Sequence, residues 1–371
     1  IKFFYRLKVT SVYEYIGRRF DARMRYVSSG IFLLLRGSWM AAAQYALGLA
    51  LTQVLGLDLW VCILTVGTLV AVYSSLGGIK GAIWTDVVQT AIMLAGIFSV
   101  LLLCVMRVPG GLAGIWELAD QGGRLRFVDP SLSLFRTTTL SLFVGTTFGI
   151  IASYGVDQVI VQRYFTTKDY PTLVRSVYAG ILATLPVLLL TTVLGVCIYS
   201  YFIAFPGRLP AGLNADQWFP AFIVGEMPAG VTGLFIACLL ATTMSSTDSG
   251  VNSLATVFIV DLYRPWLRAK RKKRREESID IGVTQRRELR LARGISFGIA
   301  GGSTIGAMFV GNLGTIIEII NKLNGPLAGV LLGIFLAAIL STRTNAMGAL
   351  LGAIIGGAIV CHVAYFTRIN F

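Results

Sequence analysis

Five hydroxyl side chains recur at three- and four-residue intervals within one apolar stretch of the chain: Thr242, Ser245, Ser246, Ser249 and Ser253. On an α-helix this spacing gathers the hydroxyls along one face. Several oxygen ligands of this kind, together with a freed backbone carbonyl, suit a small hard cation such as Na⁺. Ser and Thr in membrane-spanning helices also donate to carbonyls of their own helix or permit close helix packing, so a purely structural role stays open.

A second candidate is Asp86, which follows the glycine-rich residues 77–81 and lies in the first turn of an expected span. A carboxylate within the membrane is costly and is therefore a candidate for function. If Asp86 faces the hydroxyl-bearing helix, it can help to hold or release a cation. The alternative is a helix-start carboxylate that interacts with the positive end of the helix dipole.

Two expected spans contain helix-breaking residues. Ser153, Tyr154 and Gly155 interrupt the span 138–162, and residues 321–326 interrupt the span 314–341. Interrupted helices that meet near the middle of the bilayer are typical of secondary transporters, which expose backbone groups to substrate there.

The elements that must position these residues are membrane helices. The chain has 371 residues, of which 55% are hydrophobic and only 13% charged, and its mean hydropathy is +0.74. Soluble domains carry about 25% charged residues, so the composition indicates an integral, all-α polytopic membrane protein and excludes a large soluble catalytic domain. A single histidine, His362, and the absence of a paired-carboxylate motif disfavour an enzyme.

Hydropathy predicts about nine spans, and the charges give their orientation. Twenty-four of the 32 Lys and Arg residues fall on the side predicted to be cytoplasmic, as the positive-inside rule requires. Twelve of them lie between Arg264 and Arg293, and we expect this basic loop, 263–292, to contact anionic lipid headgroups and not nucleic acid. The expected spans are 27–55, 58–76, 82–106, 138–162, 174–203, 231–262, 293–311, 314–341 and 345–366.

Four ordered motifs together resemble the sodium/solute symporter family: residues 11–20, 77–89, 156–164 and 244–253. The resemblance is nearest to the iodide, vitamin and monocarboxylate branch. It implies one transmembrane transporter domain over 1–371 with a LeuT-like fold of two inverted five-helix repeats. The chain is expected to start just before the third core helix, so the family's first core helices are missing from it.

The resemblance also implies an assignment of the segments and of the sodium ligands. Residues 1–26 form a cytoplasmic segment, 27–106 core helices 3–5, 138–341 core helices 6–10, and 345–366 an extra helix. The family's sodium ligands correspond to the backbone carbonyl of Thr242 and the hydroxyls of Ser245 and Ser246, with Asp86 as a further sodium or coupling residue.

For the substrate, the implied positions are Trp39, Ile150, Tyr154, Asn324 and Leu327. Sugar-type members carry polar residues where this chain has Ile150, Ser153 and Thr184, and sialic-acid-type members carry an arginine where it has Trp39. Both substrates are therefore disfavoured, and a small anion or organic acid is expected. Arg36 and Lys322 could serve such an anion, although packing or snorkelling explains them equally well.

The sequence thus predicts a multi-pass protein of the plasma or inner membrane that uses Na⁺ to move a small solute into the cell by alternating access. Two alternatives stay open: a transport-inactive sensor or regulatory module with the same fold, and a symporter for a sugar or an amino acid.

Overall fold

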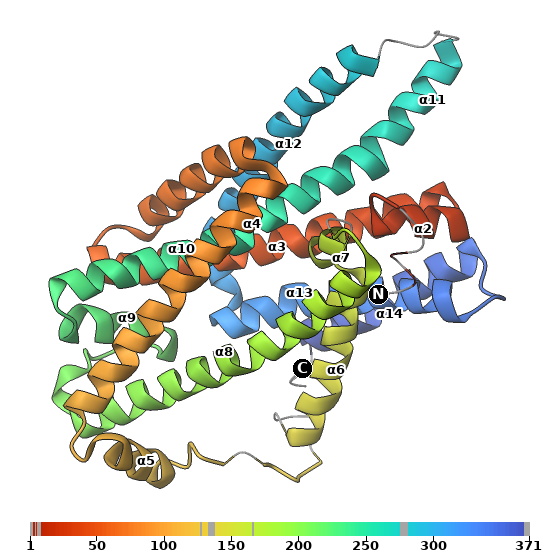
Figure 1. Ribbon diagram of the computed structural model, residues 1–371. Helices are drawn as coiled ribbons and strands as arrows, with labels where there is room; N and C mark the ends of the chain where they lie inside the picture. The colour runs from red at the N-terminus through yellow and green to blue at the C-terminus, as the bar shows by residue number, and fades with distance from the viewer. Residues whose placement is uncertain are drawn as a thin grey trace.

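The computed structural model describes residues 3, 5, 9–126, 128–132, 138–164, 167–274 and 281–366. The ordered elements of this part of the chain are helices (Figure 1). They are α2 (Val12–Arg19), α3 (Ala22–Leu55), α4 (Leu59–Arg107), α5 (Gly111–Gln121), α6 (Thr139–Val156), α7 (Gln158–Tyr164), α8 (Tyr170–Ala204), η1 (Pro206–Arg208), α9 (Ala215–Glu226), α10 (Ala229–Val257), η2 (Phe258–Tyr263), α11 (Arg264–Arg274), α12 (Ile281–Val310), η3 (Gly311–Leu313), α13 (Ile316–Leu340) and α14 (Ala346–Phe366).

Seven stretches of the described chain are long and apolar enough to cross a membrane, so the expected number of nine is not confirmed. They are Asp86–Arg107, Thr139–Val156, Tyr170–Ala204, Gly230–Lys270, Arg290–Leu313, Glu318–Leu340 and Ala346–Phe366. Leu59–Ser75, the first part of α4, is a shorter apolar helical stretch, and α3, which contains most of the expected span 27–55, is not among the seven.

The glycine-rich turn expected at 77–81 does not end a helix. α4 is one helix of 49 residues that contains both expected spans, 58–76 and 82–106. Figure 1 shows α4 as two arms that meet at a sharp bend. Neighbouring glycines let a helix bend without interrupting its secondary structure, because they lack the Cβ that would crowd the inside of the bend.

The expected interruption of the span 138–162 is confirmed, although it lies two residues further along than expected. Residues 153–155 are helical, and the break comes at Asp157, whose backbone is extended between α6 and α7. The expected interruption of the span 314–341 is wrong. α13 runs without a break through Pro326, and this proline is buried. Packing by neighbouring helices stabilises such a proline inside a membrane helix.

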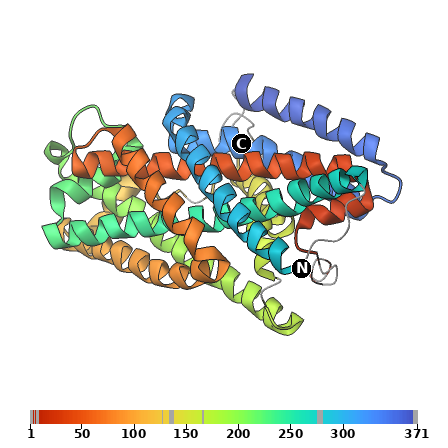
Figure 2. The same ribbon diagram turned by 90° about the horizontal axis from the view of Figure 1, so that it is seen from above.

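α10 lies at the centre of the bundle and packs against α4, α3 and α12. Gly96 of α4 makes one of these contacts close, because a Cβ at this position would lie 2.9 Å from the Cβ of Cys238 on α10. Small residues allow two membrane helices to approach in this way. Figure 2 shows α14 at one edge of the bundle, where it packs on α13.

Two short helices, α5 and α9, lie in the segments that connect the long ones. α9 lies between the long helices α8 and α10. It contacts α3 and α8 and buries Phe222 and Ile223 completely. The basic loop 263–292 is largely helical, because α11 continues from α10 through the π-helix η2 and α12 begins at Ile281. Residues 275–280 of this loop lie outside the described residues.

Candidate functional site

The centre of the candidate cation site is a contact between two helices that are far apart in the sequence. Asp86 of α4 and Ser245 of α10 face each other, and the Ser245 hydroxyl donates a hydrogen bond to Oδ1 of Asp86. The Asp86 side chain is only 19% exposed. The carboxylate therefore lies against the hydroxyl-bearing helix, as a coupling role requires.

Arg163 completes this group and was not predicted from the sequence. It lies near the end of α7, and its Nη2 is 2.8 Å from Oδ2 of Asp86 and 2.7 Å from the hydroxyl of Ser249. The Arg163 side chain is 44% exposed. We call Asp86, Arg163, Ser245 and Ser249 the carboxylate–serine cluster. A protein cation thus occupies one oxygen of the Asp86 carboxylate in this conformation.

The other residues of the hydroxyl stripe are placed as follows. The Thr242 hydroxyl donates to the carbonyl of Cys238 at 2.9 Å, and the Ser253 hydroxyl donates to the carbonyl of Ser249 at 2.8 Å. These two therefore make the within-helix bonds of the structural alternative. Ser246 is half-buried on α10, next to Ser245 in the chain.

A second polar group surrounds Arg36 on α3. Its Nη1 lies 3.9 Å from Oδ2 of Asp157, at the break between α6 and α7, and its guanidinium lies 6.0 Å from the ring centre of Trp39. The Ser38 hydroxyl is 3.1 Å from Oδ1 of Asn324 on α13. We call Arg36, Trp39 and Asp157 the Arg36 cluster. Ser38 lies two residues after Arg36 on α3, so its contact with Asn324 is a separate one on another face of the helix.

Two buried donors lack a hydrogen-bond acceptor among the described residues: Nε of Arg36 in the Arg36 cluster and Nδ2 of Asn324 beside Ser38. Buried polar atoms in folded proteins are nearly always paired, so each donor points to a partner outside the described residues. Each of the two donors is suited to binding an acceptor such as a carboxylate oxygen.

The structure does not bring all the expected substrate residues together. Trp39 belongs to the Arg36 cluster and Asn324 contacts Ser38 on another face of α3, whereas Ile150 is 52% exposed on α6. The backbone carbonyl of Tyr154 accepts a hydrogen bond from Tyr164. Leu327 lies one helical turn after Asn324 on α13. Lys322 binds the carbonyl of Leu313 at 2.7 Å, so its role here is to hold the start of α13.

The description "Sodium:solute symporter family" belongs to the family model that matches residues 1–356. This chain belongs to the sodium:solute symporter family. The family assignment and the apolar helices together make it a multi-pass integral membrane protein.

Individual members of the family are similar over most of this chain. A sodium-dependent multivitamin transporter of Oryctolagus cuniculus is 32% identical over 336 residues, which cover 88% of this chain and 50% of the relative. A sodium-coupled monocarboxylate transporter 1 of Xenopus laevis is 33% identical over 336 residues, 87% of this chain and 51% of the relative. A sodium/sialic acid symporter of Proteus mirabilis is 34% identical over 266 residues, 71% of this chain and 53% of the relative. The chain thus spans about half the length of these relatives.

A solved structure of the family has the same fold. It is a Na⁺-coupled sialic acid symporter in a substrate-bound, outward-open state, described as revealing a novel Na⁺ site. It matches with a TM-score of 0.85 at 29% identity, covering 100% of this chain and 74% of that chain. The match confirms the expected all-α, LeuT-like symporter fold.

Proposed function

We propose that this protein is a sodium-coupled symporter of the plasma membrane that moves a small organic anion into the cell by alternating access. The observation that carries the proposal is the contact between Asp86 and Ser245. It places a carboxylate and a hydroxyl from two different helices at one point inside the bundle, where a cation can join the two helices.

The donor set favours Na⁺ over a transition metal or a divalent ion. The proposed site would combine one carboxylate, from Asp86, with neutral oxygens from Ser245, Ser246 and the Thr242 carbonyl. The described residues contain no group of three or more His, Cys, Asp or Glu that could hold a metal ion. Hard oxygen ligands with a single negative charge suit a weakly bound monovalent cation, which can be released on the other side of the membrane.

Arg163 and Na⁺ compete for Asp86 in this proposal. The guanidinium binds the carboxylate in the present conformation, and Na⁺ replaces it when the ion enters from the outside. The Arg163 side chain is nearly half exposed, so it can move into water at small cost. Asp86 then has a positive partner in both states, which avoids an unpaired carboxylate inside the membrane.

The Arg36 cluster supports an organic acid as the substrate. Arg36 is near Asp157 but too far from it for a hydrogen bond, and its Nε lacks an acceptor among the described residues. A substrate carboxylate would satisfy Nε of Arg36. Two of the relatives are named for monocarboxylates and for sialic acid, which are acids. The basic helix α11 would meanwhile lie against anionic lipid headgroups.

The test is transport by the full-length protein in proteoliposomes. A Na⁺ gradient, but not a K⁺ gradient, should drive uptake of radiolabelled propionate as a short monocarboxylate probe. Asp86→Asn should abolish most of this uptake, and Asp86→Glu should retain part of it. Asp120→Asn, which changes an exposed carboxylate on α5, is the matched control and should transport normally.

Arg36→Gln separates the substrate site from the sodium site. This variant should lose uptake while Na⁺ still raises its melting temperature, and Arg126→Gln, an exposed arginine, should do neither. Sodium and substrate binding without uptake would favour the sensor alternative. Normal Na⁺-driven uptake by Asp86→Asn would refute the sodium role of the carboxylate.

A further inference from the structure

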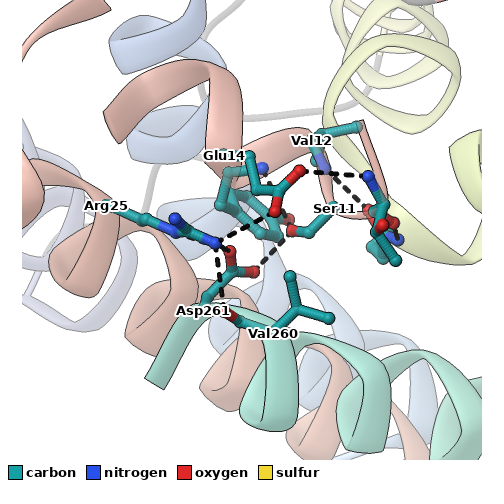
Figure 3. Close-up of polar contacts among 9 residues, drawn as sticks. Ser11, Val12, Glu14, Arg25, Val260 and Asp261 are labelled. Atoms are coloured by element: carbon teal, nitrogen blue, oxygen red, sulfur yellow. Dashed lines mark hydrogen bonds and ion pairs between the residues drawn. The ribbon is translucent and has the colours of Figure 1, made fainter. Parts of the chain in front are cut away.

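A buried ionic contact joins the end of the central helix to the start of the chain. Asp261 lies in the π-helix η2, and its side chain is 0% exposed. The hydroxyl of Ser11 donates to its Oδ2 at 2.5 Å, and Arg25 donates from Nε to its Oδ1 at 2.7 Å (Figure 3). Nη2 of Arg25 also donates to the carbonyl of Val260 at 3.0 Å. We call Ser11, Arg25 and Asp261 the cytoplasmic latch.

A hollow of about 300 Å³ lies beside the latch, between α2, the start of α3 and α11. Arg18 of α2 and Arg268 of α11 are exposed on its walls. Its chemically important lining residues are Glu14, Arg18, Arg25, Tyr26, Pro265 and Arg268.

The lining of the hollow carries more positive than negative charge. Glu14 is the carboxylate of the lining, and it already accepts from the backbone N–H of Thr10 at 3.1 Å and from Arg25 at 3.4 Å. Arg25 is committed to Asp261. Arg18 and Arg268 have no ion pair or hydrogen bond with any side chain in the described part of the protein. The hollow therefore presents two free guanidinium groups from two different helices.

We propose that this hollow binds a phosphate group, carried by an anionic lipid headgroup or by a soluble phosphate compound. Guanidinium groups bind phosphate through paired, charge-assisted hydrogen bonds. The volume accommodates a phosphate with a small substituent. The hollow lies at the base of the basic helix α11, where the anionic headgroups of the inner leaflet are concentrated.

Binding has a mechanical consequence. A phosphate held by Arg18 and Arg268 bridges α2 and α11, and the latch joins the residues next to them, Ser11 at the start of α2 and Asp261 in η2 (Figure 3). The bound phosphate thus stabilises the latched arrangement of the cytoplasmic side. The site lies apart from the carboxylate–serine cluster, so its existence does not depend on the transport proposal.

The test compares two double variants of the full-length protein that remove the same charge. Arg18→Gln with Arg268→Gln empties the hollow of its free guanidinium groups. Arg23→Gln with Lys270→Gln removes two neighbouring exposed charges that do not line it. Melting temperature is measured in detergent with potassium phosphate against potassium chloride at equal ionic strength, and in nanodiscs of phosphatidylcholine with or without phosphatidylglycerol.

Phosphate or phosphatidylglycerol should raise the melting temperature of the wild type and of the control double variant. The variant with Arg18→Gln and Arg268→Gln should need about tenfold more phosphate or phosphatidylglycerol to reach half of the maximal rise in melting temperature, equivalent to ~1.4 kcal/mol. A shift with inorganic phosphate identifies a soluble ligand, and a shift only in phosphatidylglycerol nanodiscs identifies a lipid. Equal responses of the two double variants, or no response of the wild type to either probe, would overturn the proposal.

Discussion

Replacing Arg163 with Gln removes the positive charge that Asp86 faces in this structure, and the protein should then need less Na⁺. Nη2 of Arg163 lies 2.8 Å from Oδ2 of Asp86. Two unit charges about 4 Å apart attract each other by roughly 1 kcal/mol in water and about 4 kcal/mol at an effective dielectric constant of 20. Because the Arg163 side chain is 44% exposed, the lower value applies, about 1 kcal/mol. If Na⁺ must displace this pair, its loss should lower the half-saturating Na⁺ concentration by about fivefold.

The assay is the Na⁺ dependence of uptake, checked by the Na⁺ dependence of the melting temperature in detergent. Arg163→Lys keeps the charge and should stay near the wild-type Na⁺ requirement. Lys168→Gln removes an exposed positive charge five residues along the chain from Arg163 and should change little, which controls for the general surface potential. An unchanged or higher Na⁺ requirement in Arg163→Gln would refute the competition and leave Arg163 a structural residue.

Three further predictions test other parts of the structure. Ser245→Ala or Ser246→Ala should raise the Na⁺ concentration for half-maximal uptake by about tenfold, or ~1.4 kcal/mol, and unchanged Na⁺ dependence in both would return these serines to helix packing. The Glu226 side chain is 6% exposed and accepts hydrogen bonds from Arg107 at 3.1 Å and from Arg208 at 2.5 Å. Glu226→Gln should therefore lower the free energy of unfolding by about 1–2 kcal/mol, measured by thermal unfolding. The loss is smaller than for a fully buried ion pair because both arginines are half exposed. A cysteine placed at Ser278 should resist an impermeant thiol reagent added outside intact cells, and rapid labelling would reverse the proposed topology.

Much of this fold is predictable from hydropathy, because each membrane helix makes its own backbone hydrogen bonds and appears as a local apolar stretch in the sequence. Seven stretches long and apolar enough to cross the membrane coincide with expected spans. The errors occur where the outcome depends on neighbours. Gly77 and Gly78 permit a bend as well as a turn, and Pro326 is compatible with a break as well as with a helix that packing stabilises. Local sequence cannot choose between these pairs of outcomes.

The candidate site was likewise predictable only where it depends on local sequence. The stripe of hydroxyls on α10 predicts which face of the helix is polar, and the structure places Asp86 against Ser245 of that face. Binding of Na⁺ at these residues stays a prediction. Arg163 was missed although it lies within the motif 156–164, because its distance from Asp86 depends on where the break at Asp157 directs α7. The latch residue Asp261 was missed because Ser11 and Arg25 are more than 230 positions away in the chain.

The short helix α7 connects residues 10–12, near the start of the chain, to the carboxylate–serine cluster. At its start, Gln158 donates to the carbonyl of Thr10 at 2.9 Å and accepts from the N–H of Val12 at 3.0 Å. Near its end, Arg163 binds Asp86 and Ser249. The helix is therefore held by its first residue to the cytoplasmic segment and by its last turn to the carboxylate–serine cluster.

The contacts of α7 and of the latch both involve the residues just before α2. The same cytoplasmic segment is fixed to the end of the central helix, because Ser11 donates to Asp261. If Na⁺ displaces Arg163 as proposed, the hydrogen bonds from Arg163 to Asp86 and Ser249 are lost, while α7 stays packed on α10 and Gln158 stays bound to Thr10 and Val12. If the protein transports as proposed and residues 1–26 lie in the cytoplasm as predicted, opening toward that side would have to separate Ser11 and Arg25 from the buried Asp261, which is costly until another group or water reaches the carboxylate. α7 is also held to α6, because Tyr164 donates to the carbonyl of Tyr154, so under the proposed function a change at Asp86 would reach residues 10–12 through α7.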